Sequence, residues 1–185
     1  MSAVNISQKE FTQYYPHSGW VEHDPEDLWN TAVSTFKDVL QKSKLTADKI
    51  TAIGITNQRE TTVVWDPKSG KCPFNAIVWQ DRRTSDFCKK LKEQSKEEMI
   101  KNKTGLLLDP YFSSTKLNWL INNIPDGYNR AKNGELIFGT VDSYLIWKLT
   151  GGKSHVTDAT NASRTMLFNI KDNKWDEEIC NLMGI

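Results

Sequence analysis

A polar triplet interrupts an apolar stretch in the first third of the chain. Gln58, Arg59 and Glu60 separate the apolar run 49–56 from the apolar run 61–65. Charged side chains rarely occupy such a context unless they are paired or bound to a ligand. Arg59 can only donate hydrogen bonds and Glu60 can only accept them, so the two suit a ligand with adjacent hydroxyl groups. They would equally suit a structural ion pair at a strand end, and both interpretations stay open.

Two aromatic residues could complete such a site. Trp79 ends the apolar run 75–79, and Tyr111 lies in a loop ahead of a predicted helix. A lone Trp ordinarily packs in the core, but it can also form an apolar wall under the carbon skeleton of a small polyol. A Tyr in such a loop is usually a half-buried anchor, and its hydroxyl can also reach a ligand. Because successive strand residues face opposite ways, Arg59 and Glu60 share a ligand only if the strand breaks there.

Other polar segments offer weaker chemistry. Residues 158–165 are dense in small polar side chains, which predicts a loop or helix cap satisfied by its own side chains. His17 and His23 flank Glu22 without a third ligand nearby in sequence, so a loop is favoured over a metal site. The sequence contains neither a Walker-type phosphate loop nor a Ser nucleophile elbow. The residues alone therefore indicate an α/β domain with a candidate site for a small polar ligand.

Strand-like and helix-like segments alternate along the chain, which is typical of α/β proteins. Strands are predicted at 49–56, 61–65, 75–79 and 136–138, with a loosely alternating edge strand at 4–14. Helices are predicted from Pro25 to about residue 44, and at 84–93, 96–103, 113–122, 141–149 and 176–183. Asp24 and Pro25 form a typical helix start. The last helix has an apolar side that we expect to need a partner from elsewhere: Ile179, Leu182 and Met183.

Composition excludes several function classes. The 185 residues include 24 Lys+Arg and 23 Asp+Glu, a net charge of +1, which argues against nucleic acid or anionic lipid as a partner. The apolar runs are too short to span a bilayer, and the first ten residues do not resemble a signal peptide. Three widely spaced cysteines then predict free thiols in a reducing compartment. Together these features predict a cytoplasmic protein without membrane insertion.

Five longer motifs occur in a characteristic order, at residues 19–25, 53–62, 75–79, 138–142 and 157–168. With them, the chain closely resembles the glycerol kinases, which belong to the sugar-kinase family with the ribonuclease H-like, actin-like ATPase fold. The strings Asn-Gln-Arg-Glu-Thr and Thr-Asn-Ala-Ser-Arg-Thr are specific to glycerol kinases, whereas Trp-x-Asp-x-Arg at 79–83 is wider in the family. The resemblance covers essentially the whole chain and implies phosphorylation of glycerol by ATP to glycerol 3-phosphate.

The resemblance also implies roles for individual residues. Arg59, Glu60 and Tyr111 fall on glycerol-contacting positions, and Trp79 falls on the apolar wall. The family's phosphate-binding hairpin precedes Met1, and its general base and second domain follow Ile185. Residues 1–185 are therefore expected to be part of an N-terminal glycerol-binding domain that holds no catalytic base or metal ligand. ATP and Mg²⁺ are expected in the full-length enzyme only, and the isolated chain is expected to be inactive.

Two rival functions remain at this stage. One is a kinase for another polyol or sugar, against which the Gln58-Arg59-Glu60 string argues. The other is a non-catalytic polyol-binding or interaction module derived from a truncated kinase gene. Whether the full-length enzyme forms a homo-oligomer is left open by the sequence.

Overall fold

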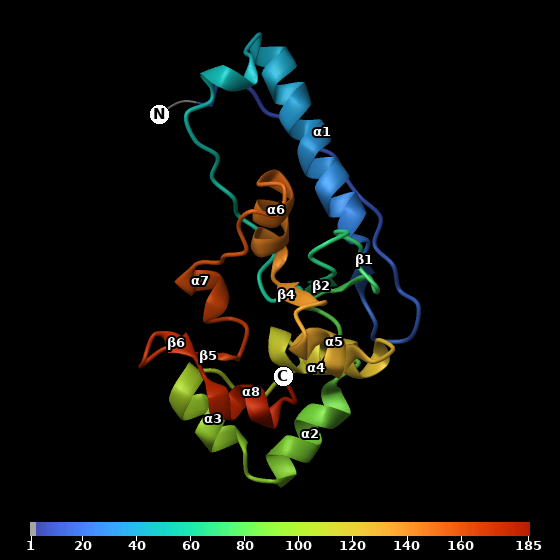
Figure 1. Cartoon of the computed structure of the whole chain (residues 1–185), viewed down its shortest axis with the longest axis vertical. Coiled ribbons are helices and arrows are strands. Elements are labelled where there is room, and N and C mark those ends of the chain that lie inside the picture. Colours follow the sequence, from blue (N-terminus) through green and yellow to red (C-terminus); the bar gives the residue numbers. More distant parts are fainter. Residues whose placement is uncertain (1–2) are drawn as a thin grey trace.

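The computed structural model describes residues 3–185, which form short strands and helices of mixed α/β type (Figure 1). The helices are α1 (Pro25–Ser43), α2 (Ser85–Glu93), α3 (Glu97–Thr104), α4 (Ser113–Asn123), α5 (Gly127–Lys132), α6 (Val141–Leu149), α7 (Ala159–Ala162) and α8 (Glu177–Leu182), with a 3₁₀ turn η1 (Ala47–Lys49). The strands are β1 (Glu22–His23), β2 (Val63–Trp65), β3 (Ala76–Ile77), β4 (Ile137–Gly139), β5 (Phe168–Asn169) and β6 (Lys174–Trp175).

The strands pair antiparallel, two by two: β1 with β3, β2 with β4, and β5 with β6. The register of β2 and β4 places Val63 opposite Gly139 and Trp65 opposite Ile137. An isolated bridge between Thr62 and Ile77 links the first two pairs. Residues 59–62 lead directly into β2, and the bridge at Thr62 joins their end to β3. The polar triplet therefore lies close to the strand that precedes Trp79.

Local signals in the sequence define most helices correctly. The Asp24 side chain accepts a hydrogen bond from the Glu26 amide, and Pro25 occupies the first turn of α1, as predicted. Helix α3 ends at Gly105, whose φ of +73° is left-handed. Helix α6 has the predicted bounds. Helix α5, strand β1 and the β5–β6 hairpin were not predicted, because each is only two to six residues long and lacks a repeating apolar pattern.

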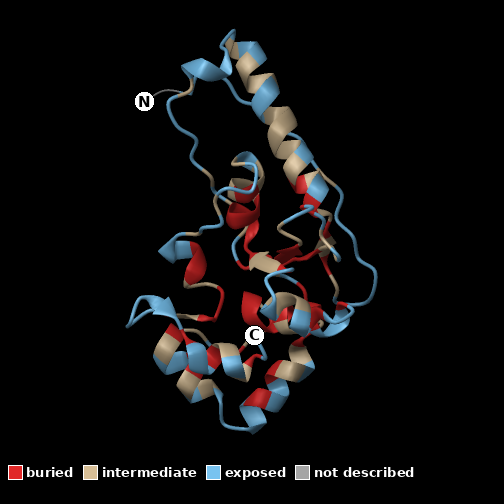
Figure 2. Ribbon diagram, viewed as in Figure 1, coloured by how far each residue is buried: buried red, intermediate tan, exposed pale blue. Residues whose placement is uncertain are grey.

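Two apolar clusters form the core, which Figure 2 shows as buried residues in the central and lower parts of the molecule. The larger cluster joins α2, α3, α4 and α8, and the smaller one joins β2, β3 and α6 with the first turn of α1. In α8, Ile179 is fully buried, as is Met183 immediately after the helix. The expectation that this helix needs a partner from elsewhere is wrong, because the larger cluster of the same chain covers it.

The arm, defined as residues 3–13 and 29–58, largely extends away from this core, although Phe11 and Trp29 pack against the smaller cluster (Figure 1). None of its residues is buried. The predicted strand 49–56 does not form and Ile53 is 55% exposed. The predicted edge strand 4–14 is reduced to a single bridge between Tyr14 and Glu22. Both predictions are wrong because neither segment has a neighbouring strand along its length, and an apolar alternation alone does not satisfy the backbone.

The sequence also predicted the state of the cysteines and the lack of a membrane-spanning segment. Cys72, Cys88 and Cys180 are free, as predicted, and Cys88 is buried. Within residues 3–185, no helix is both long and apolar enough to cross a bilayer.

Candidate functional site

The polar triplet forms a tight turn rather than a continuous strand. Glu60 has a φ of +67°, a left-handed conformation that non-glycine residues rarely adopt. Its backbone carbonyl accepts hydrogen bonds from Ser113 Oγ and Thr62 Oγ1, both at 3.0 Å. The break that the sequence required is therefore present. It places Glu60 in the interior and its neighbour Arg59 at the surface.

The carboxylate of Glu60 pairs with a residue far away in sequence. Arg164 Nε donates to Glu60 Oε1 at 2.6 Å, while the Glu60 side chain is 2% exposed and that of Arg164 is 27% exposed. The adjacent Arg59 is thus not the ion-pair partner of Glu60. Sequence reasoning missed Arg164, which it assigned to a self-satisfied polar loop. The one available signal was its position in the Thr-Asn-Ala-Ser-Arg-Thr string.

Aromatic rings lie beside this ion pair. The Arg164 guanidinium carbon is 5.6 Å from the centroid of the Tyr111 ring and 4.9 Å from that of Phe112. The Tyr111 ring in turn contacts Trp79, with 5.2 Å between centroids. The structure therefore brings three predicted residues, Glu60, Tyr111 and Trp79, into one chain of contacts through Arg164. The rings offer an apolar surface next to a charged pair, a combination suited to a small molecule with hydroxyl groups on a carbon skeleton.

A buried lysine holds the loop that carries Tyr111. Lys116 Nζ donates to the carbonyls of Pro110, Tyr111 and Phe112, the last two at 2.7 and 3.1 Å. Burial lowers the pKa of Lys116 to about 7, and the negative charges of Asp81 and Glu60 oppose this shift. The Asp109 carboxylate also accepts from the Tyr111 amide at 2.8 Å. The position of Tyr111 is therefore fixed by its own loop and by the start of α4.

A second buried network fixes the segment after Trp79. Asp81 accepts hydrogen bonds from the Val21 amide at 2.7 Å and from the side chain of Arg83. Arg83 also donates to Glu22, and its guanidinium carbon lies 3.6 Å from the centroid of the Trp20 ring. Two carboxylates, Asp81 and Glu22, share the one guanidinium of Arg83, so each charged group in this network has an ion-pair partner. The Trp-x-Asp-x-Arg string thus anchors the loop that presents Trp79.

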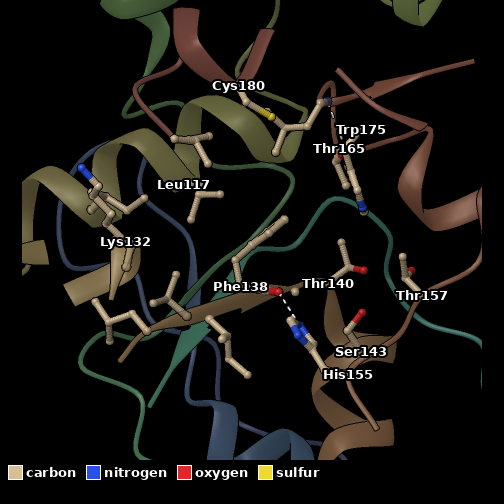
Figure 3. A pocket seen from close by; sticks show the side chains of 18 of the residues that line it. Leu117, Lys132, Phe138, Thr140, Ser143, His155, Thr157, Thr165, Trp175 and Cys180 are labelled. Carbon is tan, nitrogen blue, oxygen red and sulfur yellow. Dashed lines mark hydrogen bonds between the residues drawn. The ribbon is translucent and has the colours of Figure 1, made fainter. Parts of the chain in front are cut away.

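A cavity of about 750 Å³ lies beside β4 and α6 (Figure 3), and none of the four predicted residues lines it. Its walls are mainly apolar, and several of its polar groups already have partners. His155 Nε2 lies 2.8 Å from the Phe138 carbonyl, Ser143 donates to the Val156 carbonyl, and Thr157 donates to Asp142. A polyol needs free donors and acceptors, so this cavity suits it less well than the surroundings of Glu60.

The acidic side chains near the predicted site are few and already paired. The described residues contain no group of three or more His, Cys, Asp or Glu side chains that could hold a metal ion. The carboxylates near Tyr111 are engaged instead: Glu60 with Arg164, and Asp81 with Arg83. These residues therefore do not fit a Mg²⁺ site.

The chain is similar to several known kinases. The chain is 61% identical to a glycerol kinase of Sinorhizobium fredii over 182 residues, which are 98% of this chain and 37% of that protein. A Plasmodium falciparum glycerol kinase crystallised with ADP has a TM-score of 0.79 at 38% identity, with 97% of this chain and 35% of that chain covered. A gluconate kinase from Lactobacillus acidophilus has a TM-score of 0.83 at 26% identity, over 96% and 34% of the two chains.

The chain thus spans little more than a third of the length of the relatives it matches. Its fold is that of their N-terminal portion, the actin-like ATPase fold, as the sequence predicted. The sequence also matches the N-terminal domain of the FGGY carbohydrate kinases over residues 2–185. Family model and fold therefore agree, and the chain belongs to the FGGY family of carbohydrate kinases.

Proposed function

We propose that residues 1–185 form part of the N-terminal, glycerol-binding domain of an ATP-dependent glycerol kinase. The observation that carries this proposal is the buried carboxylate of Glu60, which is paired with Arg164 beside the rings of Tyr111 and Trp79. The 61% identity to a glycerol kinase supports glycerol over other substrates. The higher TM-score to a gluconate kinase at only 26% identity shows that the backbone alone does not select the substrate.

Each residue of the proposed site has a separate task. Glu60 accepts hydrogen bonds from glycerol hydroxyls, Arg59 donates to them from the surface side of the turn, and the Tyr111 hydroxyl adds a further contact. Trp79 covers the carbon skeleton. A site built in this way rejects analogues that lack a hydroxyl, because its polar groups are then left without partners.

The rest of the reaction requires parts of a full-length kinase. We propose that, in the full-length enzyme, ATP supplies the phosphoryl group and Mg²⁺ accompanies the ATP. Within that enzyme, the contribution that we propose for this chain is to bind and orient glycerol. We further propose a cytoplasmic location, without nucleic acid or membrane partners, which the near-neutral net charge of +1 supports.

A chimeric kinase tests the proposal. In it, this chain replaces the matching segment of the Sinorhizobium fredii glycerol kinase. Glu60→Gln keeps the shape of the side chain but removes its charge. Hydrogen bonds to charged groups are worth about 1.5–3 kcal/mol, so we expect the glycerol KM to rise about ten-fold to a hundred-fold. The KM for ATP should change little, and Trp79→Ala should also weaken glycerol use.

Glu135→Gln is the matched control, since it makes the same exchange at an exposed carboxylate. It should leave both KM values at those of the unmodified chimera. If Glu60→Gln lowers the melting temperature and leaves the glycerol KM unchanged, then Glu60 is only a structural ion-pair partner. A folded chimera that binds ATP but phosphorylates another polyol or sugar instead of glycerol would contradict the proposed substrate.

A further inference from the structure

Arg164 links the carboxylate and the aromatic side of the proposed site. Its Nε holds one oxygen of Glu60, and its guanidinium lies over the rings of Tyr111 and Phe112. Among residues 3–185, neither the second Glu60 oxygen nor the terminal nitrogens of Arg164 make a further hydrogen bond. The pair therefore keeps one acceptor and several donors available next to an aromatic surface.

The backbone around Arg164 is fixed before any ligand arrives. Asp158 caps α7 by accepting from the Asn161 amide at 2.7 Å. Three residues after α7, the carbonyl of Thr165 accepts from the Ser114 amide at 2.9 Å. The neighbouring Ser113 donates to the Glu60 carbonyl at 3.0 Å. Both partners of the ion pair are thus attached to the first turn of α4, which sets their separation and direction.

We propose that Arg164 is a positioning residue that orients the Glu60 carboxylate toward the substrate and thereby sets the preference for a fully hydroxylated polyol. This inference rests on the proposed function. A guanidinium suits the task because it is planar, always charged, and able to stack on a ring while it donates in its own plane. A lysine would keep the charge but would lose this fixed geometry.

Arg164→Met and Arg164→Lys test the inference in the chimeric kinase. For Arg164→Met we expect the glycerol KM to rise by about ten-fold or more, with the KM for ATP unchanged, because Glu60 loses a charge-assisted hydrogen bond. Arg164→Lys should give a smaller rise at an unchanged melting temperature. Arg130→Met is the control, because Arg130 pairs with Glu135 at 3.8 Å outside the site.

Two further readouts separate positioning from a purely structural role. The ratio of kcat/KM for glycerol to that for propane-1,2-diol should fall in Arg164→Met, since the missing hydroxyl is then less strongly required. In the double variant Glu60→Gln/Arg164→Met, the rise in KM should be clearly smaller than the product of the two single effects.

Different results would overturn the proposed function and the positioning role of Arg164. A folded, ATP-binding chimera that does not phosphorylate glycerol at all removes the proposed function, and this inference with it. An active chimera in which both Arg164 variants keep the original glycerol KM and the original discrimination removes the positioning role alone. If Arg164→Met does not fold, the glycerol KM of Arg164→Lys decides, and an unchanged value overturns the inference.

Discussion

Two neighbouring segments with the same strand-like pattern have opposite fates in this structure. Residues 63–65 form β2, which pairs with β4 and lies fully in the core. Residues 49–56 were also predicted to form a strand, yet they form none and expose Ile53 to 55%. The turn at Arg59 and Glu60 lies between them. The difference shows that an apolar run becomes a strand only where a second strand is available to satisfy its backbone.

The proposed site lies at the boundary between the arm and the core. Glu60, Trp79, Tyr111 and Arg164 are held by the core side, through the start of α4 and the Asp81–Arg83 network. Arg59, which precedes Glu60 in the turn, is exposed. The arrangement of the site therefore depends on the packing of the core, and changes in the arm should reach it weakly.

The largest expected contrast comes from deleting one apolar side chain in each region. Trp65 is fully buried in the smaller apolar cluster, and Trp65→Ala should cost about 3–5 kcal/mol of unfolding free energy. Ile53→Ala in the arm should change it by less than about 0.5 kcal/mol. Urea unfolding followed by far-UV circular dichroism measures both. Equal losses would show that residues 49–56 pack against something that the structure does not place there.

A pair of glycines gives a second, smaller contrast. A Cβ at Gly139 in β4 would lie 2.6 Å from Ser143 Cβ and 2.9 Å from the Trp65 ring, whereas one at Gly54 would meet nothing within 4 Å. Gly139→Ala should therefore destabilise the chain by about 1–3 kcal/mol through overpacking. Gly54→Ala should be neutral or stabilise it by up to about 1 kcal/mol. A destabilising Gly54→Ala would contradict the open surroundings of the arm.

These contrasts also explain what the sequence could predict about the fold. Helix signals are local: Asp24 and Pro25 begin α1, and Gly105 ends α3, all within a few residues of the elements they define. Strand formation is not local. The pattern at 49–56 could not reveal whether a partner strand lies beside it, and the burial of α8 could not be read from α8 itself.

In the candidate site, too, some residues could be predicted from the sequence and one could not. Glu60, Trp79 and Tyr111 were predicted from residue type and resemblance, and the structure brings them together, although their role in binding stays a prediction. Arg164 lies 104 residues from Glu60 in sequence, so no spacing rule could pair them. Its own neighbours, such as Ser163, suggested only a self-contained polar loop. Long-range ion pairs of this kind become visible only when the backbone is placed.

The smallest expected effect concerns the buried charge on the core side of the turn. Burial lowers the pKa of Lys116 to about 7 in the folded chain, from an ordinary value of 10.5. Between pH 7 and 10.5, Lys116 is protonated in the unfolded chain and mostly neutral in the folded chain. The unfolding free energy should therefore increase with pH above 7, and the stability gained from the neutral amine should be lost as pH falls through 7. Above pH 9 this trend is opposed, because burial raises the pKa of Cys72 to about 12 and of Cys88 to about 11.

The informative window is therefore pH 7 to 9. We expect the unfolding free energy to rise by on the order of 1 kcal/mol across the window. Lys116→Met should abolish that rise, while Lys89→Met, at an exposed position, should retain it. A pH dependence that survives Lys116→Met would assign the effect to another group and leave the core side of the turn without a titrating charge.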